Sequence, residues 1–373
     1  MNKEFRQRLM AYANGTADEA ERQRIEQELR EIEAYREVID DLLREQEGEA
    51  VSLDRERQER ILRSSRRKAH ISTVSVALVA LLLVTPIASL ATLSYYAFGN
   101  RAAELRHAVM ASIEITEPNL KVDAREAELD VSPFFTMSTR MKLVKQVGGK
   151  QVYAGEQVTS FVFSRPEKHQ REMRTEPLPT IPMPDNIPFL HPEKQGPDDF
   201  LSSARIGEFA RGWDQLSRLP DGTVAEAYLS FDRLYTPEQI AETLAPFDLE
   251  LLWYAVDTGM EKTFQNRDGV HVPPIGYPAK PDEHPDSPFS PEKNNREQFL
   301  HELAFLAERE DVAVAASRSK VLNLQERLDY IRRHGIQVYG AVVTGPSKEI
   351  LKLRQTGRVR GLLIGETALW NWR

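Results

Sequence analysis

Residues 71–98 form one long stretch that contains no Asp, Glu, Lys, Arg or His. The hydrocarbon core of a bilayer is about 30 Å thick, and a helix of roughly 20 apolar residues crosses it. The stretch is longer than this, and Tyr95, Tyr96 and Phe98 near its end are typical of the aromatic belt at a membrane interface. We therefore predict a single transmembrane helix over Ile71–Phe98.

A buried core helix and a cleaved signal peptide are the alternatives for this stretch. A signal peptide has a short charged leader and an apolar core of roughly 7–15 residues. Here residues 1–70 precede a longer apolar run, so both alternatives fit the sequence less well than a membrane span.

Basic residues flank the apolar stretch unevenly. Arg101 and Arg106 follow it, whereas the comparable length before it holds seven: Arg55, Arg57, Arg60, Arg63, Arg66, Arg67 and Lys68. Because Lys and Arg accumulate on the cytoplasmic side, we predict a single-pass protein of the cell membrane with its N-terminus in the cytoplasm and its C-terminus outside. The basic residues are better interpreted as anchors against anionic lipid than as contacts with nucleic acid.

The composition excludes several functions. A net charge of −8 gives no support for direct nucleic-acid binding, and the absence of Cys excludes disulfides, Cys-based zinc sites and thiol nucleophiles. The eight histidines show no zinc-binding spacing, and no G-x-S-x-G motif occurs. We therefore predict no enzymatic activity, no catalytic residue, no cofactor and no metal.

Residues 1–70 are predicted to form a cytoplasmic segment of helices. A short helix, Lys3–Ala13, ends at Asn14-Gly15, and the T-x-x-E sequence Thr16–Glu19 is a capping box for a second helix. The second helix carries a narrow apolar stripe at helical spacing, interrupted at Arg36. Its residues are Ile25, Leu29, Ile32, Ile39 and Leu43. The basic part, Leu53–His70, runs into the membrane helix without Gly or Pro.

So small a segment cannot bury this stripe in a core of its own. The stripe could pack on the first helix or on a second copy as a coiled coil, but we favour a protein partner. The 14 acidic and 8 basic residues within residues 1–50 would steer a basic partner toward it. The predicted partner-binding residues are Leu9, Tyr12, Ile25, Leu29, Ile32, Ile39 and Leu43.

Residues 99–165 are predicted as a membrane-proximal β region outside the cell. Its helical start, Ala102–Ile113, could continue the membrane helix, and alternation over residues 135–143 indicates a strand. A hairpin is expected around Gly148-Gly149, with another strand at Val158–Phe163. Eight prolines then indicate a stiff connector over residues 166–199, for which a Pro-motif ligand is the less favoured interpretation.

Residues 200–373 are predicted to form an extracytoplasmic α+β domain with two β-α-β units. Each unit has two strands joined through a helix, and two further helices lie between the units. The strands are expected at 223–231, 249–256, 336–343 and 359–364, and the further helices at 296–309 and 320–334. The first unit contains a capping box, Thr236–Gln239, with Pro237 at the first helical position. The segment Arg267–Pro291 is too rich in Pro for regular structure.

Two motifs could indicate a binding or catalytic site. The run Gly340–Lys348 resembles a phosphate-binding loop, but Pro346 stands where that motif needs Lys, so a strand-to-helix turn is expected. Asp257 and Glu261 follow an apolar strand and could form a carboxylate pair in a cleft. Such residues more often bond a loop, which is the interpretation we favour.

Several stretches closely resemble the C-terminal domain of the sigma factor regulator family of Firmicutes. They are LPDGTVAEAYLSFDRLYTPEQI, LLWYAVDTGMEK, IGYP, RLDYIRRHGIQVYGAVVTGPSKEILKL and GLLIGETALWNW, at 219–240, 251–262, 275–278, 327–353 and 361–372. Residues 8–45 resemble the N-terminal domain of the family. The resemblance implies a membrane-bound anti-sigma factor of the sigma-M regulator type, linked to cell-envelope stress, and carries over no zinc site and no interface residues.

Two functions follow as hypotheses. In the first, the cytoplasmic helices sequester an extracytoplasmic-function sigma factor, while the outer domain senses a signal or binds a second membrane protein. In the alternative, the chain is an envelope-anchored binding or assembly protein whose cytoplasmic helices only dimerise. An enzyme on the outer surface is the least favoured.

Overall fold

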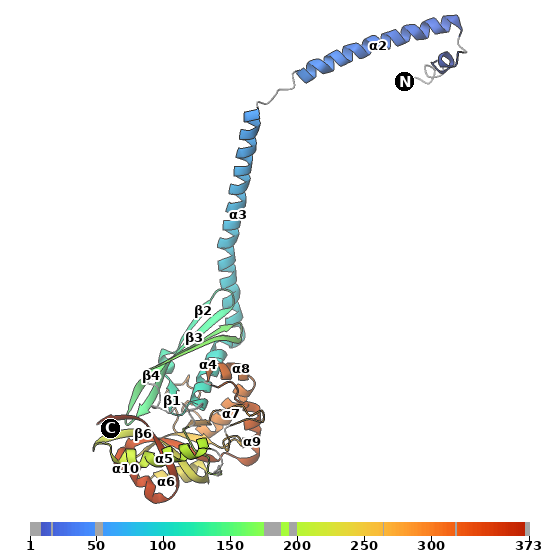
Figure 1. Cartoon of the computed structure of the whole chain (residues 1–373). Coiled ribbons are helices and arrows are strands. Elements are labelled where there is room, and N and C mark those ends of the chain that lie inside the picture. Colours follow the sequence, from blue (N-terminus) through green and yellow to red (C-terminus); the bar gives the residue numbers. More distant parts are fainter. Residues whose placement is uncertain are drawn as a thin grey trace. The chain divides into compact units, whose positions relative to one another are not determined.

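The computed structural model describes residues 9–15, 18–48, 55–174, 188–193, 200–263, 265–317 and 319–369. The chain divides into two compact units, Met1–Leu82 and Leu83–Arg373 (Figure 1). The described part of the first unit is helical. It contains a helical segment over residues 9–13, the helix α2 (Glu19–Gly48) and the first part of α3 (Arg55–Ala97).

Helix α2 begins where the sequence predicts, but the described cap is Asp18. Its Oδ1 accepts the backbone N–H of Glu21 at 2.7 Å, which satisfies one of the free amides of the first turn. Thr16 of the predicted capping box lies outside the described residues, as does the beginning of the first predicted helix up to residue 8.

Helix α3 is long and apolar enough to cross a membrane, and none of its most apolar window is buried by protein. It is continuous from the basic flank through Pro86, as predicted, but it does not continue into Ala102–Ile113. Gly99 and Asn100 have φ values of 73° and 57°, so the chain turns there before α4 (Arg101–Thr116) begins. Gly and Asn adopt this left-handed conformation most readily, which is why the break falls at this pair.

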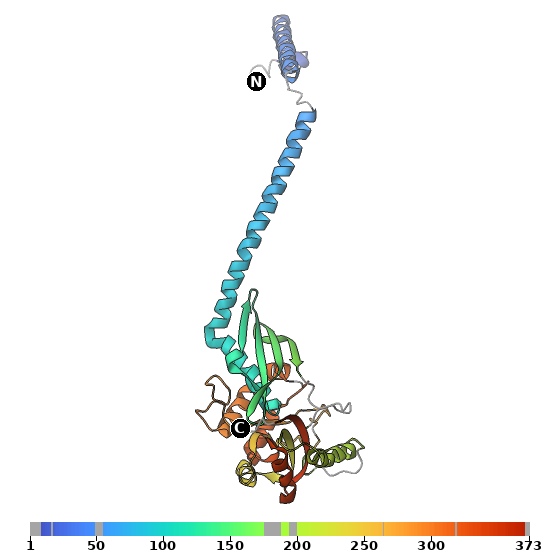
Figure 2. The ribbon, with the colours of Figure 1, turned by 90° about the vertical axis from the view of Figure 1, so that its left-hand side faces the viewer.

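The second unit contains two antiparallel sheets. In the first sheet the strand order is β1-β3-β4-β5, and β2 also pairs with β3. The strands are β1 (Leu120–Val122), β2 (Glu128–Ser132), β3 (Thr136–Val147), β4 (Lys150–Val162) and β5 (Arg165–Met173). The predicted hairpin at Gly148-Gly149 is confirmed by the pairing of Val147 with Lys150, and Figure 2 shows the long strands of this sheet beside α4.

The second sheet has the strand order β10-β6-β9-β7-β8. Its strands are β6 (Thr223–Tyr235), β7 (Glu250–Val256), β8 (Ile275–Pro278), β9 (Val338–Pro346) and β10 (Val359–Leu369). The strands of each expected β-α-β unit do not pair with each other. Strands β6 and β7 each pair antiparallel with β9, and β9 and β10 each pair antiparallel with β6. The two strands of each unit therefore run in the same direction with one strand between them.

The described residues of this unit include six further helices. They are α5 (Phe200–Ser217), α6 (Pro237–Leu244), α7 (Asn295–Ala307), α8 (Glu310–Ala316), α9 (Leu324–His334) and α10 (Ser347–Lys352). Helix α5 packs on β10, whereas α8 packs on α4 and on β5 of the first sheet. The capping box before α6 is confirmed, because Thr236 Oγ1 accepts from Gln239 N and Gln239 Oε1 accepts from Thr236 N.

Both faces of the second sheet are buried. On one face Leu229 and Val343 join a large apolar cluster that also includes Val109 of α4 and Phe161 of the first sheet. On the other face a smaller cluster contains Phe189, Trp253 and Tyr339. The alternation of side chains along each strand places neighbouring residues in different clusters.

Several local predictions differ from the structure. Val158–Val162 belongs to β4 and is not a separate strand, because the irregularity at Gly155 bends one strand without ending it. Strand β5 takes up the start of the expected connector, whose residues 175–187 and 194–199 lie outside the described chain. Strand β8 lies inside the segment expected to be irregular, since Ile275–Pro278 pairs with β7 at the sheet edge, where Pro is tolerated.

Candidate functional site

The apolar stripe predicted on the cytoplasmic helices divides into two parts. The first part packs within the first unit: Ile25 is 1% exposed, and Leu9, Tyr12 and Leu29 are half-buried. The chain reverses at Gly15, whose φ is 72°, and Tyr12 donates a hydrogen bond to Glu26 Oε1 at 3.2 Å. Packing on the first helix, one of the alternatives for the stripe, therefore accounts for Ile25.

The second part of the stripe is open to solvent. Ile32, Ile39 and Leu43 are 50–52% exposed although all three are large apolar side chains. The described residues thus leave this part of the stripe uncovered, whereas an apolar helix face normally packs against another surface.

Sequence reasoning missed three residues that widen this face. Tyr35, Val38 and Leu42 are also exposed, and their positions interleave with those of Ile32 and Ile39 along α2. With about 100° of rotation per residue, the six residues cover an arc of roughly 140°. We call these residues the α2 face: Ile32, Tyr35, Val38, Ile39, Leu42 and Leu43. Their spacing of three and four residues was the signal that could have identified them.

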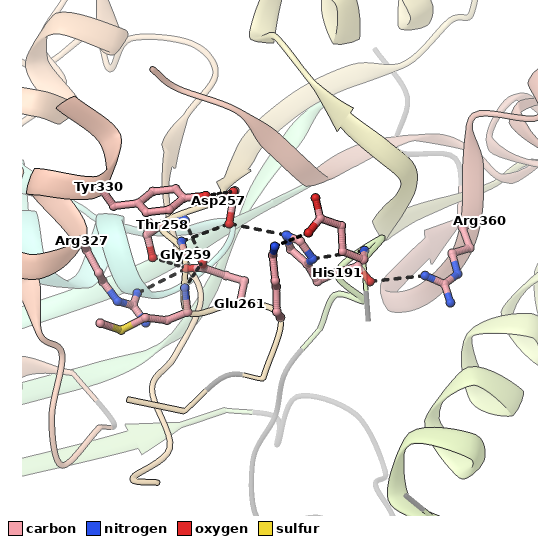
Figure 3. A network of polar contacts seen from close by, with 11 residues as sticks. His191, Asp257, Thr258, Gly259, Glu261, Arg327, Tyr330 and Arg360 are labelled. Carbon is pink, nitrogen blue, oxygen red and sulfur yellow. Dashed lines mark hydrogen bonds and ion pairs between the residues drawn. The ribbon is translucent and has the colours of Figure 1, made fainter. Parts of the chain in front are cut away.

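The carboxylate pair considered in the outer segment lies in a closed network (Figure 3). Glu261 accepts the backbone N–H of Thr258 at 2.7 Å, the Thr258 hydroxyl at 2.5 Å and the N–H of Met260 at 3.1 Å. Arg327 Nη1 of α9 lies 3.7 Å from Glu261 Oε1, and both side chains are fully buried. Burial raises the pKa of Glu261.

Asp257 joins the same loop to two other segments. It accepts from Gly259 N at 3.1 Å and from the Tyr330 hydroxyl at 2.9 Å, and His191 Nε2 lies 3.5 Å from its Oδ1. Burial opposes ionisation of Asp257, but these three neighbours outweigh it and lower the pKa of the carboxyl. Both carboxylates bond the loop, as the favoured interpretation of the sequence predicts.

A second buried cluster joins the two sheets. Lys145 Nζ of β3 lies 3.4 Å from Glu226 Oε2 of β6, and Tyr228 and Asn119 donate to Glu226 Oε1 at 2.8 and 2.7 Å. Glu226 Oε2 also accepts the N–H of Glu366 at 3.1 Å. Among the described residues, each buried side-chain N or O atom of the cluster has a hydrogen-bond partner, so the cluster holds the two sheets in one arrangement.

A cavity of about 560 Å³ lies between β1 and the β7–β8 edge of the second sheet. Charged side chains of both signs line it, and several pair across it. Lys280 Nζ is 2.9 Å from Glu250 Oε1, and Lys121 Nζ is 3.7 Å from Asp282 Oδ2. The cavity is thus polar, and within the described residues no group of His, Asp or Glu side chains could hold a metal ion.

Comparison with known proteins decides the family. The sigma factor regulator N-terminal model matches residues 59–152, and the sigma factor regulator C-terminal model matches residues 216–366. The chain is also 31% identical over 378 residues, covering 100% of both chains, to a Bacillus subtilis (strain 168) protein named "Probable anti-sigma-M factor YhdL". The chain belongs to the sigma factor regulator family. No solved structure matches it.

Members of the sigma factor regulator family are regulatory proteins and not enzymes, which agrees with the closed carboxylate network of this member. The C-terminal match includes every strand of the second sheet, apart from the end of β10. The N-terminal match begins within α3 and ends in β4, so it does not include residues 8–45, where the resemblance to that domain was expected. The relative, by contrast, aligns with the whole chain and therefore includes the α2 face.

Proposed function

We propose that this sigma factor regulator is a membrane-anchored anti-sigma factor, whose α2 face sequesters an extracytoplasmic-function sigma factor in the cytoplasm. The observation that carries the proposal is the row of large apolar side chains that stays exposed on an acidic helix. The name of the 31% identical relative supports a sigma factor as the partner. The remaining predicted residues, Leu9, Tyr12, Ile25 and Leu29, would then stabilise the first turns of α2 beside the interface.

Helix α3 supplies the anchor in this proposal. Its apolar run is long enough to cross the bilayer, and the basic residues on its N-terminal side favour a cytoplasmic α2. The part of the second unit that follows α3 would lie outside the cell, where it senses a signal or binds a second membrane protein. The polar cavity beside β1 is the described feature best suited to receive a small polar signal.

The test is capture of the sigma factor by the detergent-solubilised full-length chain. Ile39→Asp places a charge in the middle of the α2 face, and losing a central apolar contact typically costs about 2 kcal/mol, or roughly 30-fold in affinity. Ala34→Asp is the matched control, because Ala34 is exposed on α2 but lies outside the apolar arc. We expect Ile39→Asp to release the sigma factor and Ala34→Asp to retain it.

The alternative, a protein whose helices only dimerise, predicts a different result. In that case Ile39→Asp would weaken self-association of the full-length chain, measured in the same detergent, and leave sigma capture unchanged. Retained sigma binding by Ile39→Asp would therefore contradict the proposed interface.

A further inference from the structure

The outer end of α3 is covered by protein on one side only. Thr92 and Tyr96, one helical turn apart, are 1% and 2% exposed, whereas Leu90, Leu93 and Phe98 remain largely exposed. The cover consists of two turns of the first sheet, between β2 and β3 and between β4 and β5 (Figure 1).

Hydrogen bonds attach both turns to α3. Phe135 N donates to Thr92 Oγ1 at 2.9 Å, and the Tyr96 hydroxyl contacts the carbonyl oxygens of Phe135 at 2.9 Å and Phe163 at 2.6 Å. Tyr95 Oη lies 3.0 Å from Ser164 Oγ. The rings of Phe135 and Phe163 stack with centroids 4.6 Å apart, so the two turns act as one body.

The same turns expose aromatic side chains. Phe134 is 59% exposed and Phe163 is 45% exposed, and both have positive φ values, 65° and 56°. Bulky residues rarely adopt this conformation, and it is retained only where the surroundings enforce it. Large apolar side chains held outward in this way indicate a surface that has a partner.

The position of the turns along α3 identifies that partner. Counted from Ile71, the roughly 20 residues that cross the hydrocarbon core end at Leu90. The headgroup layer adds about 5–7 Å, or roughly four to five residues at 1.5 Å each, which reaches residues 91–95. The two turns contact α3 at this depth.

We propose that Phe134, Phe135 and Phe163 of the two turns, together with Phe98 directly after α3, form an aromatic foot that enters the interfacial layer of the bilayer beside α3. Its apolar surface continues the exposed apolar surface of the helix, and Arg101, 4.6 Å above the Tyr95 ring, marks the start of the polar side. Aromatic rings are enriched at this depth in membrane proteins. This inference depends on the proposed membrane span of α3.

The chain contains no Cys, so single-Cys variants of the full-length protein can be labelled at one position each. The variants are Phe134→Cys and Phe163→Cys in the foot, Val79→Cys in the membrane span and Tyr153→Cys as the matched control. Tyr153 is an exposed aromatic residue of β4, ten positions from Phe163 in the same sheet. Each variant carries an environment-sensitive fluorophore and is reconstituted into phosphatidylcholine–phosphatidylglycerol vesicles with and without brominated acyl chains.

We expect brominated lipid to quench the labels at 79, 134 and 163 at least twofold more than the label at 153. If the label at 79 is quenched but the labels at 134 and 163 are quenched no more than the label at 153, the foot is contradicted and the membrane span is not. No quenching at 79 would overturn both.

A second measurement avoids substitution in the turns. The unsubstituted chain is reconstituted with a lipid that carries a photoreactive diazirine near its headgroup and is irradiated. It is then digested with trypsin together with a protease that cleaves after Glu, so that cuts at Arg140, Lys150 and Glu156 leave Phe134, Tyr153 and Phe163 on separate peptides. Lipid adducts are expected on peptides that contain Phe134 and Phe163 and not on the peptide that contains Tyr153. Adducts confined to α3 would contradict the proposal.

Discussion

Glu114 is fully buried near the C-terminal end of α4, and among the described residues its Oε2 atom has no hydrogen-bond partner. Its Oε1 atom receives only a long contact, 3.5 Å, from Val122 N. Burial raises the pKa of Glu114 to about 8; Lys121 lowers it, and Asp282 and Glu302 raise it further. Because the pKa of such a buried group differs between the folded and unfolded states, the stability of the protein depends on pH.

The first prediction concerns this dependence. The pKa of Glu114 is 4.5 in the unfolded chain and about 8 in the folded chain. Between these two pH values the folded state therefore binds more protons than the unfolded state. The free energy of unfolding should therefore fall as the pH rises from 4.5 to 8, by at most about 4 kcal/mol. Denaturant unfolding of the full-length chain at several pH values, followed by tryptophan fluorescence, measures it.

Glu114→Gln should remove most of this slope and stabilise the protein at pH 8, because Gln stays neutral. Glu104→Gln, which changes an exposed carboxylate on the same helix, is the control and should leave the slope as it is. Equal slopes for the unsubstituted chain and Glu114→Gln would contradict the assignment.

At the scale of elements, the Tyr96 hydroxyl attaches α3 to the first sheet, together with the hydroxyls of Thr92 and Tyr95. The Tyr96 hydroxyl contacts two carbonyl oxygens from two turns, while Tyr95 points to the more exposed Ser164. Sequence reasoning assigned both tyrosines to a lipid-facing belt. The structure instead buries Tyr96 under the turns, because the first sheet reaches this part of the helix.

The second prediction compares these neighbours. Tyr96→Phe removes the contacts to both carbonyls and should lower the free energy of unfolding by about 1–2 kcal/mol, since buried polar groups lose their partner. Tyr95→Phe should cost less than half as much, because its hydroxyl bond is exposed. Thermal unfolding of both variants in the same detergent decides between them, and equal losses would argue against a special role for Tyr96.

At the scale of the whole molecule, residues 83–373 form one compact unit, which includes both regions predicted over 99–165 and 200–373. The large apolar cluster takes residues from α4, both sheets and α7, and the Lys145–Glu226 pair joins the sheets directly. Residues 200–373 therefore share an apolar core with α4 and β1, and a fragment of these residues would expose the surface that α4 and β1 cover.

The third prediction follows from this shared core. A fragment of residues 99–373 should unfold in one cooperative transition, since it keeps both sheets and α4. A fragment of residues 200–373 should lack such a transition or unfold at a much lower denaturant concentration. A cooperative transition with the same midpoint in both fragments would show that residues 200–373 are a separate domain and would contradict this prediction.

The fourth prediction concerns topology. From the uneven basic flanks of α3 we expect residue 60 in the cytoplasm and residue 120 outside. Reporter fusions that are active only in the cytoplasm or only outside should report opposite sides at these positions. An external reporter that is active at residue 60 would contradict the proposed orientation and, with it, cytoplasmic sigma capture.

The sequence by itself determined the features that depend on neighbouring residues. These include the apolar run of α3, the capping box at Thr236–Gln239, the hairpin at Gly148-Gly149 and the spacing of the stripe on α2. Caps, turns and periodic patterns depend on interactions within a few residues, so they can be predicted without knowing the tertiary structure. The resemblance to the sigma factor regulator family can also be recognised from the sequence, and the comparisons confirm it.

Only the tertiary structure decided which of these residues meet. Lys145 and Glu226 are 81 positions apart, and Tyr96 and Phe163 are 67 apart, so no local pattern predicts their contacts. The structure also separates buried Ile25 from exposed Ile39, two residues that the spacing treats alike. Burial depends on what the rest of the chain places against a surface, and that is decided by packing over long sequence separations.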